Sequence, residues 1–552
     1  MRKLMYVTML ASLAFLADAL RADVKLPAIL GDNMALQAGK PLAIWGTAEP
    51  AEKVTVTLAG QTESTSAGPD GKWQVALKPL APGGPFEMTV AGHNTLRVKN
   101  VVVGRVWVCS GQSNMYIHLD WPTFGKTEVP KANYPKLRLF EVAMKRALAP
   151  QDDCQGAWVE CTPKTAPQIS AVGFFFGREL HTTTNEPVGI IASSVGATAI
   201  QSWLSVEGFE KEPALESYAK LIRQRRADLP ALKAKQEQET PAYLAALKTW
   251  QEEHGAKADA QLKAWSEAVK AAKAAGIPEP PRPQYTPAKP LPPAAPEQGV
   301  SGTLYNGMIA PLTHHAIEGI LWYQGETNAG NAPEYRILFP RLIQDWREKW
   351  GEGDLPFLFV QLANFKARQA QPGESAWAAL REAQASALKL PKTGMAVAID
   401  LGDPGEPLNI HPRDKLNVAR RLMRAAERVV FDKQVALSPT YDTMKIEGDK
   451  IRLAFKDIGS GLAIGVPPAT QPDQKRAAPD EQLKGFAIAG DDHKWVWAQA
   501  KIEGDSVIVW SENVPHPVAV RYGWADNPDC NLYNKEGLAA VPFRTDDWPG
   551  VK

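Results

Sequence analysis

The sequence predicts an α/β protein with a mostly parallel sheet, flanked by β-rich domains and interrupted by a helical insertion. Short alternating strands fill residues 23–102, and strands return over residues 431–552. Between them, over residues 103–430, apolar strands alternate with amphipathic helices, a pattern typical of βαβ units. The composition, 44% hydrophobic and 22% charged, is that of a globular protein.

The two β-rich parts are expected to be sandwiches. Residues 54–58, Val-Thr-Val-Thr-Leu, alternate as a half-buried strand does, and turn signals separate the neighbouring runs. The C-terminal part forms either another sandwich or one that an earlier segment completes.

The central part supplies the candidate site. Ligands of parallel sheets bind at the carboxyl ends of the strands, so the residues that follow each strand matter most. The apolar strands are "VWVCSG", "LRLFEVA", "VGIIASSVG", "GILWYQGE", "PFLFVQLANF" and "GMAVAIDLG".

Residues 207–300 interrupt this alternation. Ala, Lys, Glu, Gln and Leu recur there at helical spacing, which predicts a helical hairpin or a short coiled coil. A proline-dense stretch follows and is expected to be extended. A structural spacer is favoured over a substrate lid or a dimer arm.

The N-terminus predicts export. Arg2 and Lys3 precede a short apolar run, Leu4 to Leu16, and small residues offer cleavage sites after it. We interpret residues 1–22 as a signal peptide of a secreted or periplasmic protein, with an N-terminal membrane anchor as the alternative. No later segment is long and apolar enough to span a membrane.

Charge and motifs exclude several function classes. The net charge of +1 leaves no excess of positive charge that would indicate binding to nucleic acid or to an anionic membrane. There is no His-Glu-x-x-His pair, Cys-x-x-Cys pair, P-loop or dinucleotide-binding glycine motif, so neither a metal nor a cofactor is expected. Cys154 and Cys161 are close enough to bridge a hairpin, whereas Cys109 is expected to be a buried free thiol.

Ser113 is the candidate nucleophile. It follows the first strand of the α/β part, where backbone N–H groups at the start of a helix can stabilise an oxyanion. A helix-capping serine is the alternative, and the Gly-x-Ser-x-Gly elbow is absent.

His411 is the candidate base, because it lies in a loop just before a helix in the last α/β unit. A carboxylate should orient its imidazole. Asp400, Asp403 and Glu406 all precede it closely, and we choose Asp403. Glu326, at another strand end, is a rival and is equally suited to orient a substrate.

Two further strand ends offer oxyanion donors. Gly196 lets its backbone N–H approach a ligand closely, and the Gln324 side chain carries an amide donor. A plain turn glycine and a loop hydrogen bond are the alternatives.

Taken together, the motifs resemble those of the sialate O-acetylesterase family, a branch of the SGNH (GDSL-like) hydrolases. The resemblance extends over nearly the whole mature chain except residues 207–300. The motifs are "CSGQSNM" (109–115), "SSVGATAIQSW" (193–203), "LWYQGETNAG" (321–330), "REAQ" (381–384) and "IHPRDK" (410–415), with similar flanks in "DNMALQAGKPLAIWGTAEP" and "NLYNKEGLAAVPFRTD".

The resemblance implies a flavodoxin-like, three-layer α/β/α esterase domain of SGNH type. It implies Ser113 as nucleophile, His411 as base, and Gly196 and Gln324 as oxyanion donors. Substrate contacts are then expected from the neighbouring motif residues Gln112, Asn114, Glu326 and Asn328.

Three positions depart from the pattern. Many SGNH enzymes have an aspartate three residues before the histidine, where this chain has Leu408, and some relatives have an acid two before it, where this chain has Asn409. Ala197 replaces a second glycine of the oxyanion loop. The identity of the acid therefore stays open.

The expected function is removal of O-acetyl groups from sugars by a serine esterase, through an acetyl-enzyme intermediate. O-acetylated sialic acid is the first choice of substrate, and acetylated xylan or xyloglucan is the second. A non-catalytic carbohydrate-binding protein is the alternative of another class. The sequence does not give an oligomeric state.

Overall fold

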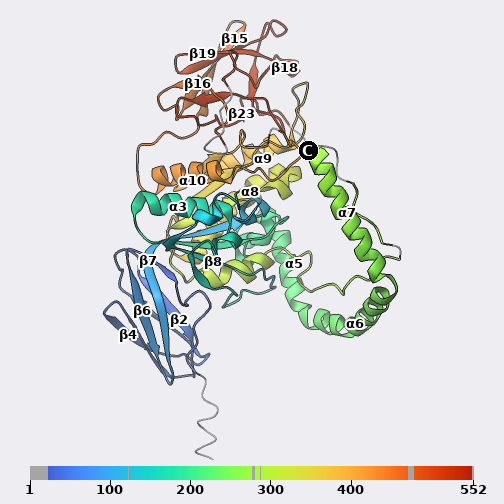
Figure 1. Ribbon diagram of the computed structural model, residues 1–552. Coiled ribbons are helices and arrows are strands. Elements are labelled where there is room, and N and C mark those ends of the chain that lie inside the picture. The colour runs from blue at the N-terminus through green and yellow to red at the C-terminus, as the bar shows by residue number, and fades with distance from the viewer. Residues whose placement is uncertain are drawn as a thin grey trace, which may run out of the picture.

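The computed structural model describes residues 23–121, 124–275, 280–285, 287–403, 405–469 and 478–549. The predicted signal peptide lies outside these residues. Figure 1 shows the N-terminal strands below a central α/β domain and the C-terminal strands above it. Within the described ranges, no helix combines the length and the apolar character that crossing a membrane requires.

The N-terminal strands form the expected β-sandwich. β3 pairs with β4 and β6, and β2 pairs separately with β5. Alternate side chains of β3 and β5 are buried, so each sheet presents one apolar face. The strands are β1 (Ala35–Gln37), β2 (Leu42–Thr47), β3 (Lys53–Leu58), β4 (Gln61–Ser66), β5 (Lys72–Leu77) and β6 (Gly83–Ala91).

One strand joins this sandwich to the central domain. β7 (Thr95–Gly111) pairs with β6 and β1 through its first half, and with two strands of the central sheet through its second half. It therefore runs without a break across the predicted domain boundary at residue 102. A single hydrophobic core extends through both parts.

The central sheet has the order β13-β12-β11-β7-β10-β8-β9, and all of its strands are parallel except the edge strand β9. The six strands expected from the sequence are all present. They are β7, β8 (Tyr134–Glu141), β10 (Val188–Ser194), β11 (Gly319–Tyr323), β12 (Phe357–Gln361) and β13 (Thr393–Val397), with β9 (Trp158–Cys161) added at the edge.

The strand order differs from the 2-1-3-4-5 order of a flavodoxin-like sheet. Counted along the chain, the parallel strands here run 2-3-1-4-5-6, because β10 lies between β7 and β8. The first strand, β7, is thus flanked directly by β10 and β11. The turns that follow these three strands meet at one place on the carboxyl edge.

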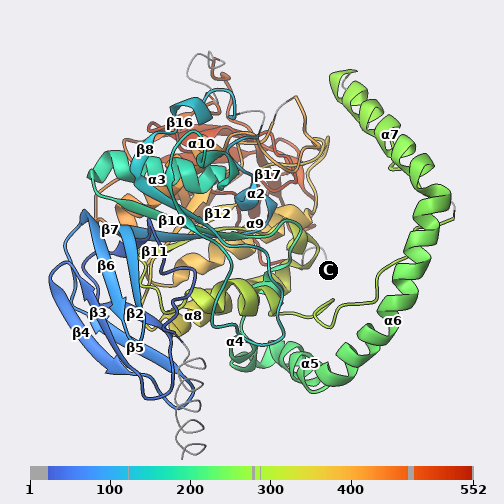
Figure 2. The same cartoon turned by 60° about the horizontal axis from the view of Figure 1, so that its bottom comes forward.

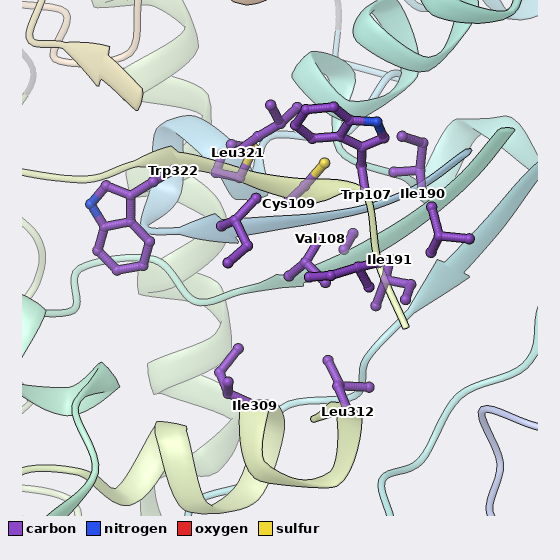
Figure 3. Close-up of a cluster of buried hydrophobic side chains, with 14 of the residues drawn as sticks. Trp107, Val108, Cys109, Ile190, Ile191, Ile309, Leu312, Leu321 and Trp322 are labelled. Carbon is purple, nitrogen blue, oxygen red and sulfur yellow. The ribbon is translucent and has the colours of Figure 1, made fainter. Parts of the chain in front are cut away.

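Helices cover both faces of the sheet and complete three layers. Trp107 of β7 packs against Phe176 of α3, whereas Trp322 of β11 packs on the other face against Phe339 of α8. Figure 3 shows the apolar side chains of β7, β10 and β11 on the two sides of the sheet. The helices are α3 (Ala171–Thr184), α8 (Ala332–Trp350), α9 (Ala376–Ala385) and α10 (Lys415–Val429).

The insertion is neither a helical hairpin nor a coiled coil. Its helices follow one another end to end as a curved arm (Figures 1 and 2). The indole N–H groups of Trp250 and Trp265 donate to the carbonyls of Pro287 and Pro280, each at 2.9 Å. The extended proline-rich segment, rather than a second helix, is therefore the partner of the arm. The helices are α4 (Val206–Glu210), α5 (Glu216–Ala227), α6 (Leu229–Trp250) and α7 (Ala256–Ala275), with a π-helical turn at Gln251–Gly255.

The C-terminal strands form two four-stranded antiparallel sheets, β14-β15-β20-β19 and β18-β17-β21-β23, around a second hydrophobic core. β16 and β22 form a separate pair. The strands are β14 (Thr440–Glu447), β15 (Lys450–Lys456), β16 (Leu462–Ile464), β17 (Phe486–Ala489), β18 (Val496–Trp497), β19 (Gln499–Glu503), β20 (Ser506–Trp510), β21 (Ala519–Tyr522), β22 (Leu532–Asn534) and β23 (Phe543–Arg544).

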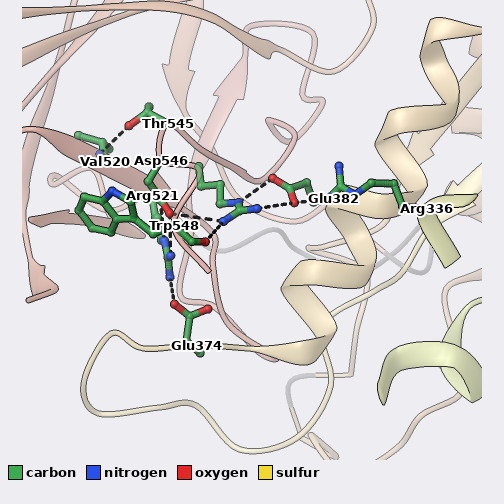
Figure 4. A network of polar contacts seen from close by, with 9 residues as sticks. Arg336, Glu374, Glu382, Val520, Arg521, Thr545, Asp546 and Trp548 are labelled. Carbon is green, nitrogen blue, oxygen red and sulfur yellow. Dashed lines mark hydrogen bonds and ion pairs between the residues drawn. The ribbon is translucent and has the colours of Figure 1, made fainter. Parts of the chain in front are cut away.

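A polar network ties this domain to the helix layer. Arg521 of β21 pairs with Asp546 at 2.8 Å and with Glu374 at 2.7 Å, and Arg544 pairs with Glu382 of α9 at 2.9 Å. Figure 4 shows these contacts, and in it Glu382 also accepts a hydrogen bond from Arg336 of α8. The last strand is thereby fixed to α9.

All four cysteines are unpaired. Cys154 and Cys161, which the sequence places close enough to bridge a hairpin, are not joined, because β9 makes its hairpin with β8 and leaves Cys154 in the connecting loop. Cys161 instead lies near the carbonyl of Ala132. Cys109 is a buried free thiol, as expected, and burial raises its pKa.

Candidate active site

The turn that carries Ser113 is defined by close packing of two strands. β7 ends at Gly111, whose φ is +136°, and a Cβ atom there would lie 2.1 Å from the carbonyl oxygen of Tyr323 in β11. Only glycine allows this approach. The Gln112 N–H donates to the same carbonyl at 3.0 Å, and the chain then enters the short helix α2 (Ser113–Tyr116).

His411 meets Ser113 at this turn. Its Nε2 lies 2.9 Å from the Ser113 Oγ, within hydrogen-bonding distance of the two atoms. The histidine belongs to the loop before α10, whose N-terminus is capped by Asp414. Burial, and secondly the charge of Lys415, lower the pKa of His411, so the imidazole is neutral and able to accept a proton near neutral pH.

Asp403 does not contact the imidazole. Its Oδ2 accepts from the Asn409 side chain at 2.8 Å, and the Asn409 Oδ1 in turn accepts from the His411 backbone N–H at 3.1 Å. Asp403 also forms an ion pair with Arg413. The carboxylate chosen from the sequence therefore stabilises the histidine loop, and in the described part of the chain no carboxylate is hydrogen-bonded to the His411 ring.

The other two acids that precede His411 are also engaged elsewhere. Asp400 forms a buried ion pair with Arg421 and accepts from Tyr533, and the exposed Glu406 pairs with Arg413. Neither is hydrogen-bonded to the imidazole.

Gly196 lies beside Ser113. A Cβ atom on Gly196 would be 3.6 Å from the Ser113 Cβ, and the next residue, Ala197, has a φ of +56° that turns the chain after β10. In the described structure, neither the Ser113 N–H nor the Gly196 N–H donates to a protein acceptor. Both N–H groups are thus available to an oxyanion.

Gln324 is placed differently from the expectation. Its side chain is buried, and the Nε2 donates to the Thr198 carbonyl at 3.2 Å and to the Asn328 Oδ1 at 2.8 Å. Its Oε1 accepts from the Tyr335 hydroxyl at 3.0 Å. Because both amide N–H groups are engaged, Gln324 holds the turn after β11 and has no free side-chain donor for an oxyanion.

The residues expected to bind substrate are mostly hydrogen-bonded within the protein. The Gln112 Oε1 accepts from the N–H groups of Gly325 and Thr327. The Asn328 Oδ1 accepts from the Ile200 N–H, and its Nδ2 donates to Gln201. These side chains connect the turns after β7, β10 and β11.

Asn114 lies at the centre of a buried polar cluster. Its Nδ2 donates to the Glu326 Oε1 at 2.5 Å and to the Ile410 carbonyl at 3.0 Å, and its Oδ1 accepts from the Lys415 Nζ at 2.5 Å. Lys415, only 1% exposed, was not identified as a site residue from the sequence. The one available signal was its position at the end of "IHPRDK".

The geometry suits acyl transfer. A hydroxyl lies against a neutral imidazole, and two free backbone N–H groups lie beside the hydroxyl. Among the described residues, no three His, Cys, Asp or Glu side chains are grouped closely enough to hold a metal ion.

Comparisons with known proteins agree with this chemistry. The family model described as "Carbohydrate esterase, sialic acid-specific acetylesterase" matches residues 103–273 and 295–428, which is more than half of the chain. The helical arm is therefore part of the family pattern, contrary to the expectation that residues 207–300 lie outside it, and only residues 274–294 are skipped.

Individual relatives cover most of the chain. The sialate O-acetylesterase of Mus musculus is 29% identical over 546 residues, which span 90% of each protein. The sialate O-acetylesterase of Homo sapiens is 28% identical, over 94% of this chain and 93% of that protein. A carbohydrate acetylesterase from Xanthomonas citri is 33% identical and superposes with a TM-score of 0.74, over 95% of this chain and 100% of that one. The chain belongs to the family of sialic acid-specific carbohydrate acetylesterases.

Proposed function

We propose that this protein is a serine esterase that removes O-acetyl groups from sugars, with O-acetylated sialic acids as the preferred substrates. The observation that carries the proposal is the 2.9 Å contact between the Ser113 Oγ and the His411 Nε2 at the carboxyl edge of the sheet. The family membership and the sialate O-acetylesterase relatives support the substrate class.

In the proposed reaction His411 takes the Ser113 proton as the Oγ attacks the acetyl carbonyl. The N–H groups of Ser113 and Gly196 then stabilise the oxyanion. His411 returns its proton to the sugar oxygen, which leaves. Water activated by His411 hydrolyses acetyl-Ser113 and releases acetate. Neither a metal nor a cofactor takes part in any of these steps.

The surroundings of His411 suit a sugar. Trp121 is 40% exposed, and its ring centroid lies 6.3 Å from that of His411. Tyr116, at the end of α2, is 44% exposed. Aromatic rings at the edge of a polar site provide apolar surface for the faces of sugar rings.

We also propose that residues 1–22 are a leader that is cleaved on export, which would give the enzyme access to glycans outside the cytoplasm. The mass of the exported protein tests this, because it should lack these residues.

Replacing Ser113 by alanine should abolish esterase activity. Loss of the nucleophile typically lowers kcat about 10⁶-fold, to the level of an oxyanion hole acting alone. Hydrolysis of p-nitrophenyl acetate by the wild type and by Ser113→Ala measures this. Equal rates for the two proteins, or an inactive wild type, would overturn the proposal and favour a non-catalytic carbohydrate-binding protein.

Activity should extend below the pH at which an ordinary histidine becomes protonated. His411 acts as a base only when neutral, so kcat/KM falls as the pH drops through the pKa of its imidazole. Burial and Lys415 hold this pKa below the usual 6.5. The half-maximal kcat/KM for p-nitrophenyl acetate should therefore lie below pH 6.5, and a midpoint above that value would contradict the assignment.

Asp403→Asn should keep most of the activity. Asparagine can still accept from the Asn409 side chain through its carbonyl oxygen, and Asp403 does not touch the imidazole. We expect less than about a tenfold loss of kcat, against the roughly 10⁴-fold loss seen when a triad acid is neutralised. Glu406→Gln, which removes the other acidic partner of Arg413, is the matched control. A loss near 10⁴-fold in Asp403→Asn alone would restore Asp403 as the triad acid.

Trp121→Ala should weaken sugar binding more than chemistry. An aromatic contact contributes roughly 0.5–1.5 kcal/mol, or about 2- to 13-fold in KM. We expect that rise for an O-acetylated sialoside and little change in kcat/KM for p-nitrophenyl acetate. Trp497→Ala, at a similarly exposed tryptophan of the C-terminal domain, is the control.

Acetate release from O-acetylated sialosides and from acetylated xylan or xyloglucan, measured with the same wild-type preparation, chooses between the two substrate classes. A faster reaction with the plant polysaccharides would replace sialic acid as the proposed substrate.

A further inference from the structure

The hydrogen bonds of Asn114 join the nucleophile to the base. Asn114 follows Ser113 in the chain, and Ile410 precedes His411. The bond from the Asn114 Nδ2 to the Ile410 carbonyl, at 3.0 Å, therefore connects the residue after Ser113 with the residue before His411. The Ser113 Oγ and the His411 Nε2, 2.9 Å apart, thus lie on two segments that this bond links.

The orientation of the Asn114 amide is set by two charged groups. An asparagine amide offers two N–H donors on one side and an oxygen acceptor on the other. Protonated Lys415 can only donate, and its Nζ contacts the oxygen at 2.5 Å. Glu326 accepts from the nitrogen at 2.5 Å. The second N–H then points to Ile410, and a flipped amide would lose all of these bonds.

Burial disfavours the charged forms of both Lys415 and Glu326. Lys415 lies at the start of α10 with its Nζ 5.3 Å from the centre of the Tyr323 ring, and burial lowers its pKa to about 7. Burial likewise raises the pKa of Glu326, and its second oxygen, Oε2, has no hydrogen-bond partner in the described structure. Removing such charges from water is unfavourable unless each is paired and hydrogen-bonded, and here the pairing passes through Asn114.

We propose that Asn114, clamped between Lys415 and Glu326, is the positioning residue that holds His411 against Ser113 in place of a carboxylate bonded to the imidazole. The proposal rests on the serine esterase function proposed above. A second support comes from the other side of the loop, where Asp403 acts on the His411 backbone through Asn409.

Lys415 has an electrostatic effect in addition. The charged groups that face it are Glu326 from the turn after β11, Asp403 from the histidine loop and Asp414 at the cap of α10. Below about pH 7 Lys415 is mostly protonated, and its charge opposes protonation of His411. Lys415 therefore helps to keep the base neutral.

The first test is Asn114→Asp, which keeps the side-chain volume but removes both N–H donors. A misplaced catalytic group can cost about 100-fold in rate, so we expect kcat for p-nitrophenyl acetate to fall at least about 100-fold with KM changed less than about threefold. Asn417→Ala is the matched control, because this buried asparagine donates to Asp414 and to the Ala469 carbonyl and has no hydrogen bond to the turn that carries Ser113. A folded Asn114→Asp protein with wild-type kcat would overturn the proposal.

The second test uses pH and does not depend on the first. Lys415→Met removes the charge beside His411, so the pH of half-maximal kcat/KM should rise, whereas Lys415→Arg, which keeps the charge, should leave it near the wild-type value. Loss of activity in both variants with an unchanged midpoint would show a purely structural role and overturn the electrostatic part.

Different results would overturn the esterase function and the positioning role of Asn114. Equal rates for wild type and Ser113→Ala overturn the esterase function itself. A rate that depends on Ser113 but is unchanged in Asn114→Asp and Lys415→Met overturns the positioning role alone.

Discussion

The site depends on the way β7 ends between its two neighbours. β7 is hydrogen-bonded to β10 on one side and to β11 on the other, and Gly111 allows its last peptide to touch the Tyr323 carbonyl. Parallel strands bring their carboxyl ends to one edge. As a result, Ser113, Gly196 and the turn that begins with Gln324 are adjacent, although they are up to 211 residues apart in the sequence.

Most polar side chains around Ser113 bond one another. Gln112, Asn114, Gln324 and Asn328 bridge the turns after different strands and are largely shielded from water. Buried polar groups of this kind are favourable only when each is satisfied, and a satisfied network fixes one geometry. By contrast, Ser113 and His411 are partly exposed, and the aromatic residues Tyr116 and Trp121 near them are exposed.

Much of this arrangement could be predicted from the sequence. The six parallel strands follow from apolar runs bounded by turns. Ser113 and His411 are candidates from their places after a strand and before a helix, the family motifs single them out, and the structure brings the two side chains together. That no carboxylate of the described residues bonds the His411 ring could not be predicted, because Asp403 and Asn409 are neighbours of His411 in sequence and only the loop conformation decides which atoms meet. Lys415 was missed for a related reason: a lysine at the start of a helix usually lies in water, whereas the fold buries this one against Asn114 and the Tyr323 ring.

The network in Figure 4 has a consequence for the order in which the fold is completed. α9 supports the site through Gln384, whose amide donates to the Gln324 carbonyl at 3.0 Å. The same helix is held by Arg544 of β23, which follows Glu382 of α9 by 162 residues in the sequence. During synthesis α9 therefore emerges well before this partner. The α/β domain can form its strands early, but the helix beneath the turn after β11 gains the Arg544 contact only after the C-terminal strands have been made.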